Sequence, residues 1–429
     1  MPRRNARLDV TPSASRLTNS LRDIGYDFNS AVADLVDNSI SAGARQIDIE
    51  TCFQGDGSYV LIADNGVGMT DASLTEAMRF GSRRDYDATE LGRYGLGLKT
   101  ASLSQCRRVT VVTRKSLVRR RISTRTLDLH HIIGSDRWEL IDAPTVSSAY
   151  RALEWLNTSP GTVVVWEHLD RILPEGRSQG GGARRRLDTH ASKVEDHLGM
   201  VFHRFIEGEA SHVDRIVITV NGRKVQAWNP LAPKEQARQV LPVREFELLA
   251  GDHAGCVKFT PVVLPARSHF SSPAEFERMS GPAKWNRQQG IYIYRADRLI
   301  QSGGWCGLRA IDEHTKLARA ALDFSPDFDE LFRINVAKMR VAVPLELRPM
   351  LEPHVTSLCH RAQNTYRRDI RKNPTSEAGT SERSPARECP EIGSSILAAA
   401  LATGNADALE AMIEHIGSET PEILKLLGW

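Results

Sequence analysis

One helical segment of this chain places a carboxylate and an amide where both can reach a single ligand. Asp34 and Asn38 stand four residues apart in VADLVDNSISAGA, at 32–44. Residues four apart lie on one face of a helix, so these two side chains can point at one ligand or one metal ion. Asp37 is the nearest rival carboxylate, but its place on the helix rotates it away from the line that joins Asp34 to Asn38.

Two glycine-rich segments follow in the chain. IADNGVGMT, at 62–70, continues a predicted strand that ends on Asp64 and leads into Gly66 and Gly68. Glycine permits backbone angles and close ligand approach that other residues resist. GRYGLGLKTAS, at 92–102, alternates glycine with apolar residues and then resumes a helical pattern. Such a segment suits a mobile flap, and the start of a helix offers free amides to phosphate oxygens.

Several other site types are excluded by their missing motifs. No GxxxxGK[ST] occurs, and the two glycines after Asp64 do not extend to GxGxxG, so neither a P-loop nor a dinucleotide fingerprint is present. No HExxH or paired CxxC occurs either, which leaves a protein-held transition-metal site without sequence support.

The elements that must position these residues can be predicted from apolar periodicity. Residues at three- and four-residue steps predict one amphipathic helix over 28–41: Phe28, Ala31, Val32, Leu35, Val36 and Ile40. GTVVVWEHL, at 161–169, predicts a strand opened by a glycine-threonine pair.

In order and spacing, these segments resemble the GHKL, or Bergerat-fold, ATPases, the superfamily of DNA gyrase, the ninety-kilodalton chaperones, histidine kinases and MutL. The resemblance implies an α/β fold, an α+β two-layer sandwich that binds ATP and Mg²⁺. It implies that Asp34 is the general base, that Asn38 binds the Mg²⁺ carried by the triphosphate, and that Asp64, with Thr162, reads the adenine. The remaining nucleotide-binding positions that it implies are Gly66, Gly68 and Met69 near the base and Gly95, Leu96, Gly97, Leu98 and Lys99 in the lid and the phosphate-side helix.

Asp34 departs from the pattern, since most ATP-hydrolysing families carry glutamate there. Aspartate is one methylene shorter, so its carboxylate lies roughly 1.5 Å further from the attacking water. A base must come within about 3 Å of the proton that it takes. We therefore expect slow hydrolysis.

The chain divides into five predicted segments. Residues 1–173 form the ATPase domain, 174–187 a Gly/Arg-rich connection, 188–370 a transducer-like S5-type α/β domain, 371–395 a disordered linker and 396–429 a short helical tail. Within the second domain, periodicity predicts helices at 188–206 and 311–321 and strands at 213–220, 255–264 and 290–295. The lid and the second domain are most similar to microrchidia (MORC) proteins and their prokaryotic relatives. In clamp-forming relatives a lysine of the second domain reaches the γ-phosphate, and Lys338 falls at that place.

Composition and charge indicate an ordinary globular chain. It has 429 residues, 41% hydrophobic and 25% charged, and six scattered cysteines without a disulfide framework. No apolar run is long enough to span a membrane, so we expect a cytoplasmic protein. The net charge is only +3, but basic residues cluster in two places, which could contact DNA phosphates or could simply be solvated strand edges. These residues are Arg107, Arg108, Arg114, Lys115, Arg119, Arg120, Arg121, Arg125 and Arg184 to Arg186.

The resemblance therefore implies an ATP-gated homodimeric clamp, with duplex DNA as the expected partner and repair, restriction or phage defence as the context. Two alternatives stay open. ATP could switch an interaction surface without being hydrolysed, or the chain could be a chaperone of the ninety-kilodalton type. A histidine kinase is disfavoured, because no histidine precedes the predicted nucleotide domain.

Overall fold

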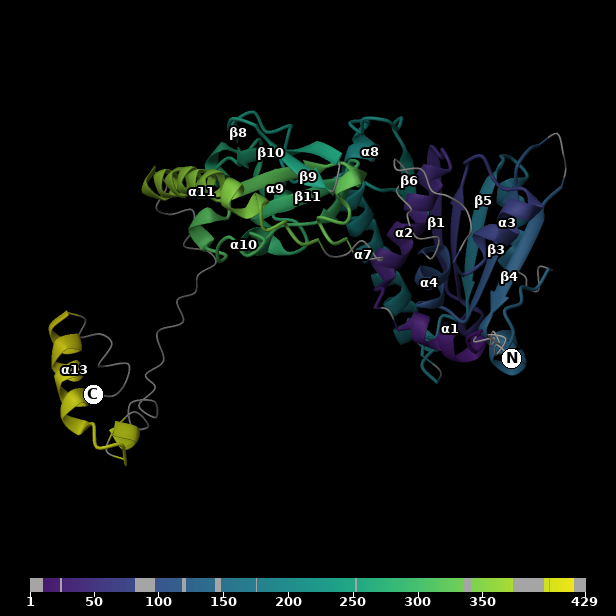
Figure 1. Ribbon diagram of the computed structural model, residues 1–429, viewed down its shortest axis with the longest axis horizontal. Coiled ribbons are helices and arrows are strands. Elements are labelled where there is room, and N and C mark those ends of the chain that lie inside the picture. Colours follow the sequence, from purple (N-terminus) through teal and green to yellow (C-terminus); the bar gives the residue numbers. More distant parts are fainter. Residues whose placement is uncertain are drawn as a thin grey trace, which may run out of the picture. The chain divides into compact units, whose positions relative to one another are not determined.

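The chain contains two mixed β-sheets with helices around them (Figure 1). The computed structural model describes residues 11–23, 25–81, 97–117, 121–142, 148–174, 176–250, 253–334, 341–372, 397–400 and 402–419. Residues 1–366 form one compact unit, which includes both sheets, and residues 367–429 form another. The predicted α/β fold class is confirmed. None of the described helices is long and apolar enough to cross a membrane.

The first sheet has seven strands in the order β4-β3-β5-β2-β1-β6-β7. Its strands are β1 (Gln46–Cys52), β2 (Tyr59–Asp64), β3 (Arg108–Arg114), β4 (Ser123–Asp128), β5 (Gly161–Glu167), β6 (Val217–Val220) and β7 (Arg223–Lys224). Neighbours pair antiparallel except β1 and β6, which run parallel.

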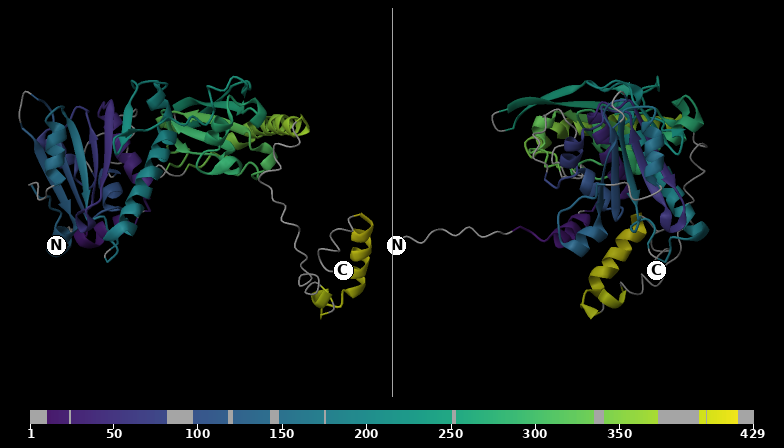
Figure 2. Two further views of the ribbon diagram at one scale, coloured as in Figure 1. Left: turned by 180° about the vertical axis from the view of Figure 1, so that it is seen from behind. Right: turned by 90° about the vertical axis from the view of Figure 1, so that its right-hand side faces the viewer.

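Helices cover both faces of this sheet. They are α1 (Ala14–Arg22), α2 (Phe28–Ser41), α3 (Asp71–Ala77), α4 (Gly97–Leu103), α5 (Leu129–Ser135), α6 (Ser148–Leu156), α7 (Gly180–Val201) and α8 (His203–Glu207), with a 3₁₀ turn at Gly55–Gly57. Along β2, Val60 and Ile62 join the core beneath α2, α4 and α7, whereas Leu61 and Ala63 join a smaller core beneath α6. This alternation follows from the two-residue period of a strand, and it makes β2 buried along its whole length. Figures 1 and 2 show α2, α4 and α7 on the same face.

Helix α2 carries two of the predicted site residues, Asp34 and Asn38. The side chain of Asp27 caps its first turn by accepting a hydrogen bond from the Ser30 amide at 2.8 Å. Its apolar stripe is buried in the core, including Val32 and Val36, each 0% exposed. The helix is therefore fixed in rotation, and so is the direction of each polar side chain on it.

The second sheet has the order β12-β11-β13-β10-β8, and β9 pairs with β10. Its strands are β8 (Gln239–Val240), β9 (Arg244–Ala250), β10 (His253–Val263), β11 (Gly290–Arg295), β12 (Arg298–Gln301) and β13 (Ala318–Phe324). The helices that follow or flank them are α9 (Pro273–Met279), α10 (Lys284–Gln288) and α11 (Leu347–Lys372), with 3₁₀ turns at Arg267–His269, Glu313–Thr315 and Pro326–Phe328. A further helix, α13 (Ala406–Glu419), lies in the second unit.

Two local predictions differ from the structure. The helix expected over 311–321 is wrong, because residues 318–324 form β13, which lies between β10 and β11 and is buried almost throughout. A run of small and apolar residues fits a doubly covered strand as well as it fits a buried helix, so periodicity alone could not separate them. The helix expected from residue 188 begins at Gly180, because Ala183 and Leu187 continue its buried face toward the N-terminus.

Candidate nucleotide site

The carboxylate of Asp34 lies against the start of α4. It is 3% exposed, and the Tyr26 hydroxyl donates a 2.6 Å hydrogen bond to its Oδ2. A Cβ built on Gly97, the first residue of α4, would lie 3.3 Å from the same oxygen. Burial, together with the charge of Asp34, raises the pKa of Tyr26, which keeps the hydroxyl a donor at neutral pH. Tyr26 therefore fixes the orientation of the predicted base.

Asp37 forms an ion pair with a residue of the second sheet. It is 0% exposed and accepts a 2.8 Å bond from Nε of Arg298, a residue of β12 in the second sheet. The same guanidinium brings Nη2 to 3.9 Å from Asp34 Oδ1. Arg298 thus connects the second sheet to both carboxylates of α2.

Asn38 is the one exposed residue in the stretch 31–40, with buried Asp37 and Ser39 on either side. Its amide points out of the helix packing and is open to a ligand. An amide oxygen is a suitable ligand for Mg²⁺, a hard cation that takes oxygen donors.

Asp64 is tied to α2 through Ser39. Ser39 Oγ donates to Asp64 Oδ2 at 3.1 Å, and the Gly66 amide donates to Oδ1 at 2.9 Å. Burial raises the pKa of Asp64 to about 6, while the bonds from Gly66 and Ser39 oppose that shift. In the ladder between β2 and β5, Asp64 stands opposite Thr162. The end of β2 and the middle of α2 therefore enclose one polar corner.

Thr113 of β3 extends this corner. Its Oγ1 lies 3.1 Å from Thr162 Oγ1 and 2.9 Å from the Gly161 carbonyl, and it accepts a 2.9 Å bond from the Met69 amide. Thr113 therefore holds the loop after β2 against the strand that carries Thr162.

The two glycines after Asp64 are required by the chain's own backbone. A Cβ on Gly66 would lie 2.7 Å from the Ala42 carbonyl oxygen, and one on Gly68, where φ is +59°, would lie 2.2 Å from the Arg114 carbonyl oxygen. A side chain at either position would displace the loop. The backbone of the chain therefore requires glycine at both positions, whether or not a ligand is bound.

Lys99 is buried in the first turn of α4, two residues after Gly97 and next to Leu98. It is 2% exposed, and its Nζ donates a 2.9 Å bond to the Ala77 carbonyl at the end of α3. Burial lowers the pKa of Lys99 to about 8, partly offset by Glu76. Three predicted positions, Gly95, Leu96 and Lys338, lie outside the described residues.

The structure thus brings Asp34, Asn38, Asp64 and Gly97 around one helix, with Thr162 and Met69 joined to them through Thr113. Sequence reasoning missed four residues that position the site: Tyr26, Ser39, Thr113 and Arg298. Ser39 offered a signal, since it is a small polar residue on a buried helical face. The others contact the site through tertiary packing, which no local pattern reveals.

Residues 26–162, which contain this corner, match the family model of histidine kinase-, DNA gyrase B- and HSP90-like ATPases. This part of the chain belongs to the GHKL ATPases. The match begins at Tyr26 and ends at Thr162, so the GHKL domain covers every described residue of the predicted nucleotide site.

Curated relatives of the chain are microrchidia proteins. ATPase MORC2B of Mus musculus is 40% identical over 78 residues, 17% of this chain and 8% of that protein. ATPase morc-1 of Caenorhabditis elegans is 34% identical over 86 residues, 20% and 10% respectively. Protein MICRORCHIDIA 5 of Arabidopsis thaliana is 34% identical over 80 residues, 17% and 11%. The chain spans about a tenth of the length of these relatives.

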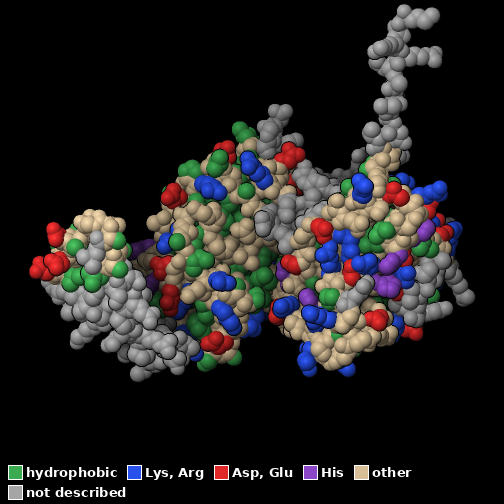
Figure 3. All heavy atoms as spheres, turned by 90° about the horizontal axis from the view of Figure 1, so that it is seen from below, with side chains coloured by type: hydrophobic (Ala, Val, Ile, Leu, Met, Phe, Trp, Pro, Cys, Tyr) green, Lys and Arg blue, Asp and Glu red, His purple; other side chains and the backbone are tan. Residues whose placement is uncertain are grey.

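The predicted basic clusters divide into paired and exposed arginines. Arg107 binds Asp170 at 2.9 Å, Arg108 binds Asp128 at 2.7 Å, and Arg125 binds Asp71 at 2.9 Å. By contrast, Lys115, Arg121, Arg184 and Arg185 are exposed. Seen from below, basic and histidine side chains gather over the GHKL domain, with acidic side chains among them (Figure 3). Only the exposed members can exchange their surroundings for phosphate without breaking an ion pair.

Proposed function

We propose that this chain binds Mg-ATP in the corner around α2 and hydrolyses it slowly. Asp64 accepts a hydrogen bond from the adenine amino group, and Asn38 holds the Mg²⁺ that accompanies the triphosphate. The observation that carries the proposal is that two contacts converge on α2. Ser39 of α2 binds Asp64 at 3.1 Å, and the start of α4 lies beside Asp34, which is also on α2. Mg²⁺ would neutralise phosphate charge, as hard cations do at oxygen ligands.

Asp34 takes the proton of the attacking water in this proposal. Its Oδ2 is held by Tyr26 at 2.6 Å, and Arg298 lies 3.9 Å from its Oδ1. A nearby positive charge favours the ionised carboxylate, which is the form that accepts a proton, but it also weakens that carboxylate as a base. Together with the short aspartate side chain, this supports turnover at the slow end of the range for ATPases.

We further propose that the second sheet senses the nucleotide through Arg298. The ion pair between Arg298 and Asp37 joins β12 to the helix that carries Asp34 and Asn38. Nucleotide can move this equilibrium only by binding one arrangement more tightly than the other. Two copies of the chain would form an ATP-dependent homodimeric clamp on duplex DNA, with Lys338 reaching the γ-phosphate. A role in repair, restriction or phage defence follows from the family likeness alone.

A second candidate function is an ATP-switched interaction module that does not hydrolyse ATP. The observation that favours it is the state of Asp34, which is short, buried and already held by Tyr26. ATP binding without phosphate release would select this candidate.

Phosphate release and equilibrium ATP binding should be measured together in the full chain, in Asp34→Asn and in Asn38→Ala. We expect Asp34→Asn to bind ATP and to lose about 10²- to 10⁴-fold in turnover, the range that a positioned general base supplies. Asn38→Ala should lose the dependence of binding on Mg²⁺. Asp196→Asn is the matched control, because Asp196 is exposed on α7. Equal turnover in all four proteins would exclude the site assignment.

Arg298→Ala tests the coupling to the second sheet. We expect turnover to fall about 10- to 100-fold with little change in ATP affinity, since small misplacements of reacting groups have effects of this size. Arg223→Ala is the control, because Arg223 pairs with Glu195 in an exposed position. Light scattering with a non-hydrolysable ATP analogue tests the clamp, and a monomer at all nucleotide concentrations would reject it.

A further inference from the structure

A second cluster of ligand-type side chains lies outside the GHKL domain. His203 and Glu207 are four residues apart on α8 and therefore share a face. Gly208 ends the helix with φ of +77°, a left-handed conformation that suits glycine, and this turn brings Glu209 back toward the other two residues. The ligand atoms of the three side chains all lie within 4.8 Å of one another.

The Nδ1 atom of His203 faces this cluster without a hydrogen-bond partner among the described residues. The residue is 1% exposed, and its Nε2 lies 2.9 Å from the Tyr294 hydroxyl. Among the described residues, none forms a hydrogen bond with Nδ1, which lies 3.9 Å from Glu207 Oε2. Burial, and then the charge of Arg204, lowers the pKa of His203 to about 3, so the ring is neutral. When Nε2 carries the ring proton and donates a hydrogen bond to the Tyr294 hydroxyl, Nδ1 has a free lone pair.

The two carboxylates are held near each other by an amide. Asn229 Nδ2 donates to Glu207 Oε2 at 3.3 Å and to Glu209 Oε2 at 3.5 Å. Burial, and then the charge of Glu207, raises the pKa of Glu209. Like charges repel at this separation, and a bound cation would relieve that repulsion.

The neighbouring cations leave this cluster available. Arg204 is turned to Asp297, at 3.0 Å, and to Asp323. Arg238 donates to the Leu231 carbonyl at 3.1 Å. Lys234 lies 3.5 Å from Glu207 Oε1, but its side chain is 80% exposed and can move into solvent.

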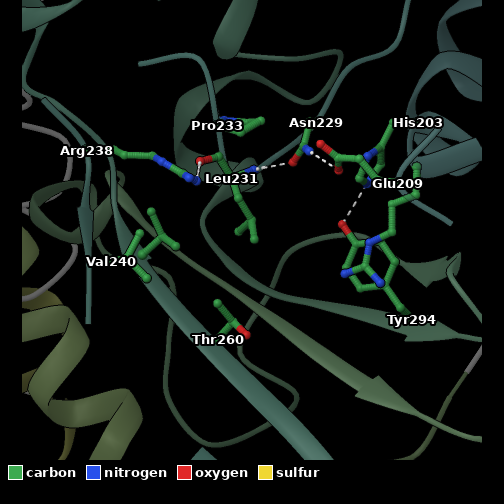
Figure 4. A pocket seen from close by; sticks show the side chains of 11 residues that line it. His203, Glu209, Asn229, Leu231, Pro233, Arg238, Val240, Thr260 and Tyr294 are labelled. Atoms are coloured by element: carbon green, nitrogen blue, oxygen red, sulfur yellow. Dashed lines mark hydrogen bonds between the residues drawn. The ribbon is translucent and has the colours of Figure 1, made fainter. Parts of the chain in front are cut away.

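A cavity of about 290 Å³ opens beside the cluster. Figure 4 shows His203, Glu209, Asn229 and Tyr294 together at one end of it, with Arg238 at the other. The cavity gives room for water molecules that would complete a coordination sphere.

We infer that His203, Glu207 and Glu209 form a binding site for one divalent transition-metal ion of the zinc type, with an open position toward this cavity. An imidazole nitrogen beside carboxylate oxygens suits Zn²⁺, Co²⁺ or Ni²⁺ better than Mg²⁺ or Ca²⁺, which take oxygen ligands. Zinc bonds to nitrogen and oxygen ligands are about 2.0–2.2 Å long, so the three side chains need to close only slightly around an ion. The Tyr294 hydroxyl accepts a hydrogen bond from Nε2–H, and a hydrogen bond at the second ring nitrogen orients a metal-binding histidine.

The test is a calorimetric titration of ZnCl₂ into the full chain, freed of metal by a chelator and without nucleotide. We expect one Zn²⁺ per chain, with affinity at least 10-fold weaker in Glu209→Gln and about 10- to 100-fold weaker in Tyr294→Phe. Glu277→Gln is the matched control, since Glu277 is an exposed carboxylate of α9, and it should bind as the parent does.

Two further readouts keep the test decisive. Thermal melts without metal show whether each variant is folded. Glu209 is chosen for substitution because it is exposed, whereas His203 is buried and its replacement would disturb the packing. Co²⁺ in place of Zn²⁺ should give d–d bands without thiolate charge transfer, which separates this site from the cysteines. Equal affinity in Glu209→Gln and Glu277→Gln, thiolate absorption in the parent, or no binding at about 100 μM (about −5.5 kcal/mol) would overturn the inference.

Discussion

Two buried cations, one beside each sheet, are stabilised in different ways. Arg319 of β13 is 0% exposed, and its guanidinium donates to the Pro230 carbonyl at 2.9 Å and to the Met279 carbonyl at 2.6 Å. It also lies 5.2 Å from the ring centre of Trp228 and 5.3 Å from that of Trp285. Hydrogen bonds and aromatic faces compensate part of the lost hydration, although burial still lowers the pKa of Arg319 and its Nε has no hydrogen-bond partner among the described residues.

Lys99 belongs to α4, the helix whose first residue lies against Asp34. It is 2% exposed and donates to the Ala77 carbonyl, yet its pKa falls to about 8, because burial outweighs the effect of Glu76. We propose that Lys99 also binds a phosphate oxygen of ATP, whereas Arg319 has a structural role alone. The comparison therefore sets a buried cation that serves packing in the second sheet against one that we propose for ligand binding in the GHKL domain.

The largest expected effect concerns Arg319. Arg319→Met keeps the volume but removes the donors to two buried carbonyls, and we expect the free energy of unfolding to fall by about 2–4 kcal/mol. Equilibrium denaturation measures this change. ATP affinity of the folded variant should equal that of the parent, and a loss of affinity would contradict the purely structural role of Arg319.

Lys99→Met should give the opposite pattern. We expect ATP affinity to fall about 10- to 100-fold, because the variant cannot form a charge-assisted bond to phosphate. The free energy of unfolding should change by no more than about 1 kcal/mol, since the variant no longer buries an ammonium. Equilibrium ATP binding and denaturation of the same preparation measure both quantities. If stability falls as much as in Arg319→Met, then the two buried cations do not differ in kind.

How far the sequence predicts this domain depends on the range of each contact. Local patterns were enough to predict the helix of Asp34 and Asn38, because apolar residues at three- and four-residue steps fix its buried face. They also predicted the strand that ends at Asp64. In both cases one segment contains all the information.

Contacts between distant segments could not be predicted in this way. Arg298 follows Asp37 by 261 residues, and their 2.8 Å bond exists only because β12 is folded against α2. Thr113 was missed for the same reason, since its partners Met69 and Thr162 are 44 and 49 residues away. Tyr26 lies only 8 residues before Asp34, but it is outside the helix whose periodicity was used. The strand β13 was mistaken for a helix because a strand that is buried on both faces lacks the two-residue alternation that identifies a half-buried strand.

The shifted pKa values of Asp64 and Lys99 predict a window of pH for ATP binding. Asp64 must be ionised to accept from adenine, and its pKa of about 6 means that binding weakens as pH falls below 6. Lys99 must be charged to attract phosphate, and its pKa of about 8 means that binding weakens as pH rises above 8. Each limb should change affinity by at most about 10-fold per pH unit, since one proton is involved.

Titrations with Mg-ATP and with magnesium tripolyphosphate separate the two limbs. Tripolyphosphate lacks the adenine, so it should lose the part of the acid limb that Asp64 causes and keep the alkaline limb. In Lys99→Met the alkaline limb should vanish for both ligands. An unchanged alkaline limb in that variant would remove Lys99 from the phosphate side of the site.

The smallest expected effect concerns DNA, and it depends on the difference between exposed and paired arginines. Arg184 and Arg185 are exposed on α7, whereas Arg108 is held by Asp128 at 2.7 Å. If the chain binds duplex DNA, then the combined change Arg184→Ala and Arg185→Ala should reduce the slope of log affinity against log salt by about 2, because each of the two arginines neutralises one phosphate. Arg108→Ala should leave the slope unchanged, because a guanidinium already neutralised by a carboxylate releases no counterion from DNA. A salt series of binding isotherms on one duplex measures both slopes. A flatter slope in Arg108→Ala than in the α7 variant would indicate that DNA contacts the first sheet at β3 and not α7.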